Sequence, residues 1–201
     1  MTRLPRPRFL AFAGLATAAL ALAVTAATSG ARQGSGLVRG NKPGEWRYWG
    51  GDAWSTRYSP LDQINEGNFK SLQVAWQWNA SKDGDDEYYR TTPLYANGRL
   101  FTVATTHRYT YAVDPATGKT LWEYRLEEGI RWQKAPRQYA GRGLSYWTDG
   151  RGDDRIMYVT TGYRLAELNA ATGAPIASFG TGGFVDLKVG AVHGADKQID
   201  L

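Results

Sequence analysis

Residues 112–122 read AVDPATGKTLW and contain the turn on which the fold assignment depends. The Asp114 carboxylate can accept a backbone N–H two residues later, and Gly118 can take the left-handed conformation that closes a hairpin. Trp122 follows four residues after Gly118, where its flat indole can lie between two neighbouring sheets. The stretch therefore predicts a hairpin whose outer strand carries an interlocking tryptophan. From the turn alone, an ordinary hairpin of a β protein is the alternative.

The turn recurs 55 residues later, as NAATG at residues 169–173. Trp76 and Trp122 lie 46 residues apart, both at expected strand positions. The second copy is degraded, because Ala177 stands where the first copy has Trp122, although Phe179 lies nearby. Self-similarity at this period is typical of β-propellers, in which each repeat forms one blade.

Short β-rich segments separated by turn residues surround both copies. The 24 glycines, 12 tyrosines, 8 tryptophans and 6 phenylalanines suit many short strands joined by tight turns. Asn97-Gly98 is a strong hairpin signal. We expect a β-rich segment at 72–78, a four-stranded meander at 91–95, 99–103, 109–113 and 121–124, further strands at 156–160 and 163–168, and a short helix near 65–72.

The net charge of +5 does not indicate a nucleic-acid-binding protein. Residues 1–32 hold four arginines and no acid, so removing those four charges from +5 leaves +1 for the remainder. A nearly balanced body lacks the basic surface that phosphate binding requires. The chain also has no cysteine, which excludes disulfides, thiolate metal sites and a lipid-modified N-terminal cysteine.

Residues 1–31 have the layout of a secretory signal peptide. Arg3, Arg6 and Arg8 precede an uncharged run over 9–24, and small residues follow. A membrane span needs about 20 apolar residues, so cleavage is favoured over retention as an anchor, which stays open. We expect export to the periplasm, with possible membrane association. Residues 32–44 are expected to be a flexible linker, and folded structure is expected over 45–201.

Three stretches carry a resemblance to a known family. The segment 112–122 resembles the tryptophan-docking motif of PQQ-dependent (quinoprotein) alcohol and glucose dehydrogenases. WGGD at 49–52, RYSPLDQI at 57–64 and LQVAW at 72–76 look like their N-terminal signature. GRGLSYW at 141–147 is similar to their segment beside the quinone. The likeness is closer to the glucose and polyol branch than to methanol dehydrogenase.

The resemblance implies an all-β fold, a partial eight-bladed β-propeller of which residues 45–201 supply about the first two blades. It implies pyrroloquinoline quinone (PQQ) and Ca²⁺ on the propeller axis. In the family, the calcium ligands and the catalytic base come after the stretch that ends at Leu201. The chain is therefore expected to be an N-terminal fragment, inactive alone, with no catalytic residue and no metal ligand of its own.

The same resemblance implies the activity of the full-length protein. It would be an oxidoreductase acting on CH–OH groups of alcohols, sugars or polyols, with a carboxylate base and Ca²⁺ assisting hydride removal. Electrons would pass to a cytochrome or a membrane quinone. The alternative is a non-catalytic propeller scaffold of the cell envelope built from PQQ-like repeats, because the repeat stabilises blades whether or not a cofactor binds.

Three arginines are the expected cofactor-binding residues. By motif position, Arg142 would bind the carboxylates of PQQ, for which a guanidinium fork is well suited. Arg137, at a position where the methanol dehydrogenase branch has one of two adjacent cysteines, and Arg90, where that branch has a glutamate, would add positive charge. A solvated turn for Arg142 and rim positions for the other two are the alternatives.

Other polar residues suggest no site. His107 and His193 lack a second ligand at metal-binding spacing, so loop histidines are expected. The acidic run at 83–87 lacks the spacing of a calcium-binding loop and is expected to be solvated.

Overall fold

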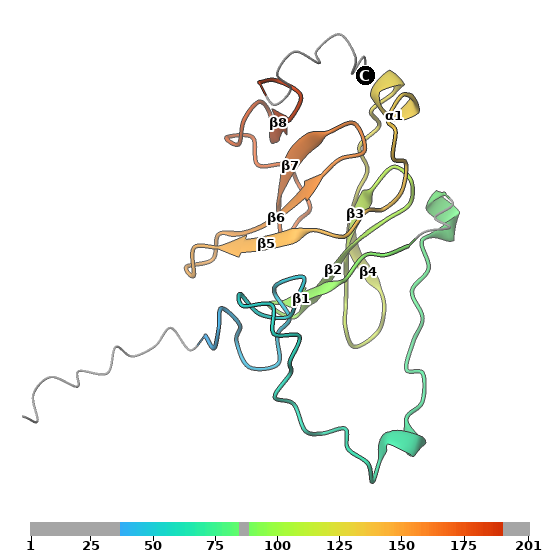
Figure 1. The fold of residues 1–201 in the computed structure, drawn as a ribbon, viewed down its shortest axis with the longest axis vertical. Coiled ribbons are helices and arrows are strands. Elements are labelled where there is room, and N and C mark those ends of the chain that lie inside the picture. Colours follow the sequence, from blue (N-terminus) through green and yellow to red (C-terminus); the bar gives the residue numbers. More distant parts are fainter. Residues whose placement is uncertain (1–36, 85–88, 191–201) are drawn as a thin grey trace, which may run out of the picture. The chain divides into compact units, whose positions relative to one another are not determined.

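The computed structural model describes residues 37–84 and 89–190, which form two four-stranded antiparallel sheets (Figure 1). The expected signal peptide at 1–31 and His193 lie outside the described residues. We call the sheet β1–β4 blade one and the sheet β5–β8 blade two. In both blades the strand order follows the chain order. The all-β class expected from the sequence is confirmed.

Blade one is the meander predicted around the Asp114 turn. Its strands pair with continuous register, from Leu94 opposite Phe101 to Ala112 opposite Trp122, and a bulge follows at Val113. Asn97 and Gly98 form the first turn, both with positive φ. The strands are β1 Leu94–Ala96, β2 Arg99–Ala104, β3 Tyr109–Val113 and β4 Thr120–Tyr124.

Blade two confirms the predicted strands at 156–160 and 163–168, which are observed at 154–159 and 164–169. Its first strand overlaps the end of the segment 141–147, and its last strand was not predicted. Residues 176–183 interrupt the outer edge before that last strand begins. Phe184, rather than Phe179, packs against the core there. The strands are β5 Ser145–Thr148, β6 Asp154–Val159, β7 Arg164–Asn169 and β8 Phe184–Asp186.

The main core lies between the two blades. Alternate side chains of each sheet point to it, because successive strand residues face opposite sides. Phe101 of blade one stacks against Tyr146 of blade two, and both are buried. A second core covers the other face of blade one, where Tyr109 and Tyr111 pack against Trp76 and Trp78.

Each repeated turn receives a tryptophan from the segment before it. The Trp76 indole Nε1 donates to Pro115 O at 3.0 Å, and its ring leaves no room for a Cβ at Gly118. The Trp122 Nε1 donates to Ala170 O at 3.1 Å, and its ring covers Gly173 in the same way. The expected docking of Trp122 between neighbouring blades is confirmed.

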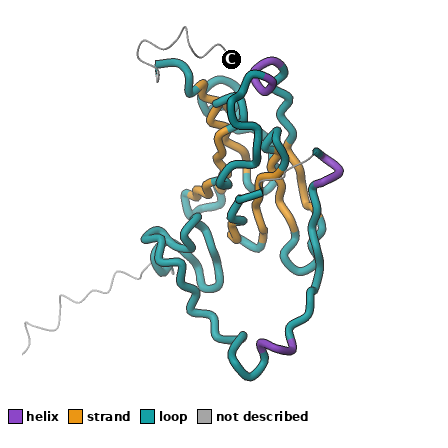
Figure 2. The backbone as a smooth tube through the Cα atoms, turned by 45° about the vertical axis from the view of Figure 1, so that its right-hand side comes forward, coloured by secondary structure: helices purple, strands orange, loops and turns teal. Residues whose placement is uncertain are grey.

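Residues 53–80 form a long excursion with little regular structure (Figure 2). The prediction of a strand at 72–78 is wrong for this structure, since an extended segment needs a partner strand and this one docks through its tryptophans instead. The helix expected near 65–72 is reduced to one 3-10 turn, η1 Phe69–Ser71. A second, η2, spans Ser81–Asp83, and one α-helical turn, α1, spans Ile130–Gln133.

Residues 37–44, part of the expected linker, contact the residues that follow them. Val38 and Asn41 pair as an isolated bridge. The Asn41 side chain donates to Gly51 O at 2.8 Å and accepts from the Arg47 N–H at 3.1 Å. These contacts fasten the start of the described chain to the residues before blade one.

Candidate functional site

A cleft of about 1260 Å³ lies at one end of the sheets. It is formed by the residues just before β1 and β5, the turn between β2 and β3, and the facing ends of β6 and β7. The strands set this arrangement, because antiparallel neighbours bring the start of one strand beside the end of the next. Its lining is Trp49, Arg90, Thr92, Arg108, Arg137, Tyr139, Ala140, Gly141, Arg142, Gly143, Leu144, Ser145, Met157, Tyr158, Val159 and Leu165.

Arg142 reaches the cleft from a loop that two glycines shape. Gly141 and Gly143 have φ of +77° and +120°, a region that favours glycine. A Cβ at Gly143 would lie 3.2 Å from Thr92 O, so the loop also packs closely on the chain leading into β1. The Arg142 side chain itself is exposed. The Gly-Arg-Gly sequence thus fixes the backbone and leaves the guanidinium available to a ligand.

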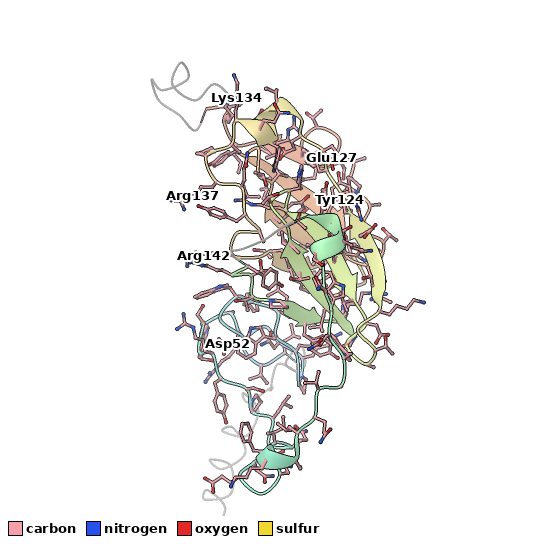
Figure 3. The ribbon with its side chains drawn as sticks, turned by 90° about the vertical axis from the view of Figure 1, so that its right-hand side faces the viewer. Asp52, Tyr124, Glu127, Lys134, Arg137 and Arg142 are labelled. Atoms are coloured by element: carbon pink, nitrogen blue, oxygen red, sulfur yellow. The ribbon has the colours of Figure 1, made fainter. Side chains whose placement is uncertain are left out.

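Arg137 and Arg90 line the same cleft as Arg142. Arg137 lies on the loop after α1, and Figure 3 shows its side chain on the same side of the chain as that of Arg142. Arg90 lies on the segment that leads into β1 of blade one. Both Arg90 and Arg137 are exposed. The structure therefore brings together all three arginines singled out in the sequence.

Arg108 and Trp49 also line the cleft, and the sequence analysis assigned neither of them a role in the site. Arg108 belongs to the turn between β2 and β3, and Trp49 lies next to Gly50-Gly51 before blade one. The Arg57 guanidinium stacks 4.8 Å from the centroid of the Trp49 ring. A signal for Arg108 existed in the repeat, since Thr-Thr-His-Arg at 105–108 matches Thr-Thr-Gly-Tyr at 160–163 with the same 55-residue offset.

The cleft is strongly cationic. Among the described residues that line it, four are arginines and none is acidic. Burial lowers the pKa of Arg108, but arginine stays protonated at any physiological pH. Such a surface attracts anions and suits carboxylates or phosphates, which guanidinium groups bind through paired hydrogen bonds. Met157, Tyr158 and Leu165 add an apolar wall.

The described residues contain no group of three or more histidine, cysteine, aspartate or glutamate side chains placed to hold a metal ion. His107 stacks on Trp132, with ring centroids 4.1 Å apart, and lies 3.6 Å from a Glu127 carboxylate oxygen. Of the acidic run at 83–87, which was expected to be solvated, residues 85–87 lie outside the described residues. Asp83 differs from the expectation, because it pairs with Arg125 and accepts from the Tyr111 hydroxyl at 2.9 Å. Within the described ranges no helix is long and apolar enough to cross a bilayer.

Comparisons with known proteins identify the family. Residues 46–200 match the model of the PQQ family described as "Glucose/ethanol/alcohol dehydrogenase, beta-propeller domain". The dehydrogenase subunit of alcohol dehydrogenase (quinone) from Gluconobacter oxydans is 32% identical over 162 residues, covering 78% of this chain and 20% of that protein. Quinoprotein glucose dehydrogenase A from Acinetobacter calcoaceticus is 28% identical over 173 residues, covering 75% and 21%.

Among solved structures, the quinohemoprotein alcohol dehydrogenase from Comamonas testosteroni aligns with a TM-score of 0.56 and 30% identity. The alignment covers 69% of this chain and 19% of that one. The chain spans about a fifth of the length of the curated relatives it matches. The family match extends over both blades and the arginine-lined cleft. The chain therefore belongs to the PQQ-dependent glucose/ethanol/alcohol dehydrogenase family of β-propellers.

Proposed function

We propose that the full-length protein containing this chain is a PQQ-dependent dehydrogenase that oxidises CH–OH groups of alcohols, sugars or polyols. The single observation that carries the proposal is the cleft on a chain of this family, in which the described lining residues include four arginines and no acidic residue. The substrate class is supported by relatives named as alcohol, glucose and glycerol dehydrogenases. Export through residues 1–31 would place the enzyme in the periplasm, where a cytochrome or membrane quinone would accept its electrons.

The residues present fit the cofactor. PQQ is a flat aromatic anion with three carboxylates, so Arg142, Arg137 and Arg90 would bind its charged edge while the apolar wall contacts its rings. When bound, PQQ supplies the quinone that receives the electrons removed from the substrate carbon. The arginines would orient this group and raise its local concentration by long-range attraction. The part of the cleft lining that the structure describes offers no carboxylate, so a calcium ion would need ligands from elsewhere.

Direct binding of PQQ to the full-length protein tests the proposal. Arg142→Ala should weaken PQQ binding about tenfold to a hundredfold, because one charged hydrogen-bonding group contributes about 1.5–3 kcal/mol. The matched control is Arg151→Ala, since Arg151 is an exposed arginine in the turn after β5 and lies outside the cleft lining. Arg151→Ala should bind PQQ like the unmodified protein.

Dye-linked oxidation of a panel of alcohols, sugars and polyols, with PQQ and Ca²⁺ supplied, then tests the reaction. The docking of Trp122 on Ala170 would stabilise the blades without any cofactor, which is the observation that favours a scaffold as the second candidate. A protein that neither binds PQQ nor oxidises any member of the panel would support the scaffold function and contradict the enzyme.

A further inference from the structure

Arg108 contacts three backbone oxygens at the wall of the cleft. Its Nε donates to Tyr139 O at 2.9 Å, and its Nη1 donates to Val159 O and Thr160 O, each at 3.0 Å. The acceptors come from two separate segments, the loop after α1 and the end of β6. One planar guanidinium on blade one therefore fastens two parts of the chain that follow it.

The first of these segments carries the ligand-facing arginines. Tyr139 lies two residues after Arg137 and three before Arg142. The backbone at Gly141 packs over the same guanidinium, since a Cβ there would lie 3.5 Å from the Arg108 Nε. The second segment is itself fixed, because Thr160 Oγ1 donates to the buried Glu128 carboxylate at 2.9 Å. Arg108 thus ties a loop to a firmly held strand end.

The charge of Arg108 is not used in an ion pair. None of the described residues places a carboxylate within ion-pair distance of it, and its three acceptors are all neutral carbonyls. Burial lowers its pKa, whereas Glu128 acts from farther away in the opposite direction. A half-buried cation without a counter-ion raises the positive potential of the space that it lines.

The turn does not require an arginine at this position. Tyr163 is the equivalent residue in blade two, with φ of 63° against 57° for Arg108. In each turn the N–H of this residue donates, at 3.1 Å, to the carbonyl three residues earlier, Thr105 O or Thr160 O. Since a tyrosine adopts the same turn conformation, formation of the turn does not explain the guanidinium at residue 108.

We infer that Arg108 is a positioning residue of the cleft. It holds the loop 134–144 so that Arg137 and Arg142 face one ligand, and its uncompensated charge strengthens the attraction for that ligand. The identity of the ligand as PQQ rests on the proposed function, whereas the positioning of the loop does not. The class of ligand that these arginines would recognise is a planar polycarboxylate.

Two readouts on the full-length protein test the inference. One is hydrogen exchange of the backbone amides of residues 134–144, measured without ligand. The other is equilibrium binding of PQQ. Arg108→Gln removes the charge and the fork, and should speed exchange in this loop at least tenfold and weaken PQQ binding about tenfold to a hundredfold. Arg108→Lys keeps the charge but cannot reach all three carbonyls, so its PQQ affinity should lie between those of Arg108→Gln and the unmodified protein.

Arg131→Lys is the matched control. The Arg131 guanidinium also joins neighbouring segments, through Gly162 O at 2.7 Å and the Asp186 carboxylate at 2.7 and 2.9 Å, but it does not line the cleft. This variant should lose global stability without changing loop exchange or PQQ affinity. If Arg108→Gln fails to fold, Arg108→Lys decides, with faster loop exchange and weaker binding as its expected result.

The outcomes separate the inference from the proposed function. Unchanged exchange in 134–144, or unchanged PQQ affinity where Arg142→Ala weakens it, would overturn the role of Arg108 and leave the function standing. An unmodified protein that does not bind PQQ would overturn the function, and faster loop exchange in Arg108→Gln would still support the positioning role.

Discussion

Residues 105–108 of blade one and 160–163 of blade two connect equivalent strands through turns with the same backbone hydrogen bond and the same positive φ at the last residue. The first threonine of each turn is fully buried. Yet blade one ends its turn with Arg108, which lines the cleft, and blade two ends with Tyr163, which does not. The backbone conformation of this turn repeats between the blades, whereas the side chain at its last position, which brings a charge to the cleft in blade one, does not.

The outer strands show a second difference. In blade one, Trp122 on β4 docks on blade two, while blade two has Ala177 at the matching position and places its outer strand later, at Phe184–Asp186. A bidentate contact from Arg131 to Asp186 holds this later strand. The exposed side chains Trp147, Val159 and Val185 lie on blade two. An indole fastens one outer strand, and an ion pair supports the other.

Of the changes that test this difference between the blades, removal of the Trp122 indole should have the largest effect on stability. Trp122→Ala would give blade one the small residue of blade two and leave a cavity beside Phe101, at the interface of the blades. We expect a loss of about 3 kcal/mol in the free energy of unfolding, at the lower end for a Trp→Ala change because Trp122 is only partly buried. Urea denaturation of the full-length protein measures it.

Trp54→Ala is the control for that experiment, because Trp54 is 73% exposed. It should change the free energy of unfolding by less than about 0.5 kcal/mol. Equal losses in the free energy of unfolding for both variants would show that the docked indole of Trp122 stabilises the fold no more than an exposed tryptophan does.

The sequence predicted the features that depend on local chemistry. The turns at 114–118 and 169–173 follow from side-chain caps and glycines, and the Asp114 carboxylate accepts from the Ala116 N–H at 2.8 Å as expected. Residues 174–183 show no alternation, so β8 could not be predicted; it forms because β7 offers it an edge. The stretch 72–78 has strand-like composition, but a strand exists only where a partner strand is available.

The meeting of Arg90, Arg137 and Arg142 could not be derived from their spacing. It depends on how blade two packs on blade one, which is set by contacts between residues far apart, such as the Asn97 amide donating to Asp154 at 2.6 Å. These arginines were found through family resemblance, and Arg108 was missed because the resemblance assigned it no role. Comparing the two repeats position by position would have singled it out.

Alanine substitutions of the glycines at the two docked turns should have a smaller effect on stability than Trp122→Ala. Gly118 and Gly173 have φ of +72° and +75°, and a Cβ at either would come within 2.7 Å of an indole ring. We expect Gly118→Ala and Gly173→Ala each to lower the free energy of unfolding by about 2 kcal/mol, because of backbone strain and displacement of the tryptophan. Equal losses in urea denaturation would show that the two turns are energetically equivalent.

Gly98→Ala separates the two causes. Gly98 has the same φ of +72°, but a Cβ there would meet nothing within 4 Å. Only backbone strain should destabilise this variant, by about 1 kcal/mol in the free energy of unfolding. Losses at residues 118 and 173 no larger than at 98 would contradict a role for close indole contact.

A similarly small effect is expected from the ion pair on the outer strand of blade two, and it depends on pH. Hydrogen bonds from Arg131 hold the pKa of the Asp186 carboxyl well below its usual range. A depressed carboxyl pKa stabilises the fold above the unfolded pKa of about 3.9, and this stabilisation is lost as pH falls toward the folded pKa. Because Asp186 is partly exposed, we expect about 1 kcal/mol of stabilisation at neutral pH.

Asp186→Asn should therefore be less stable than the unmodified protein at pH 7, and the urea midpoints of the two proteins should converge between pH 4 and pH 2. A difference that stays constant over this range would assign the stabilisation to packing of β8, and the contrast between an indole-fastened and an ion-pair-fastened outer strand would not hold.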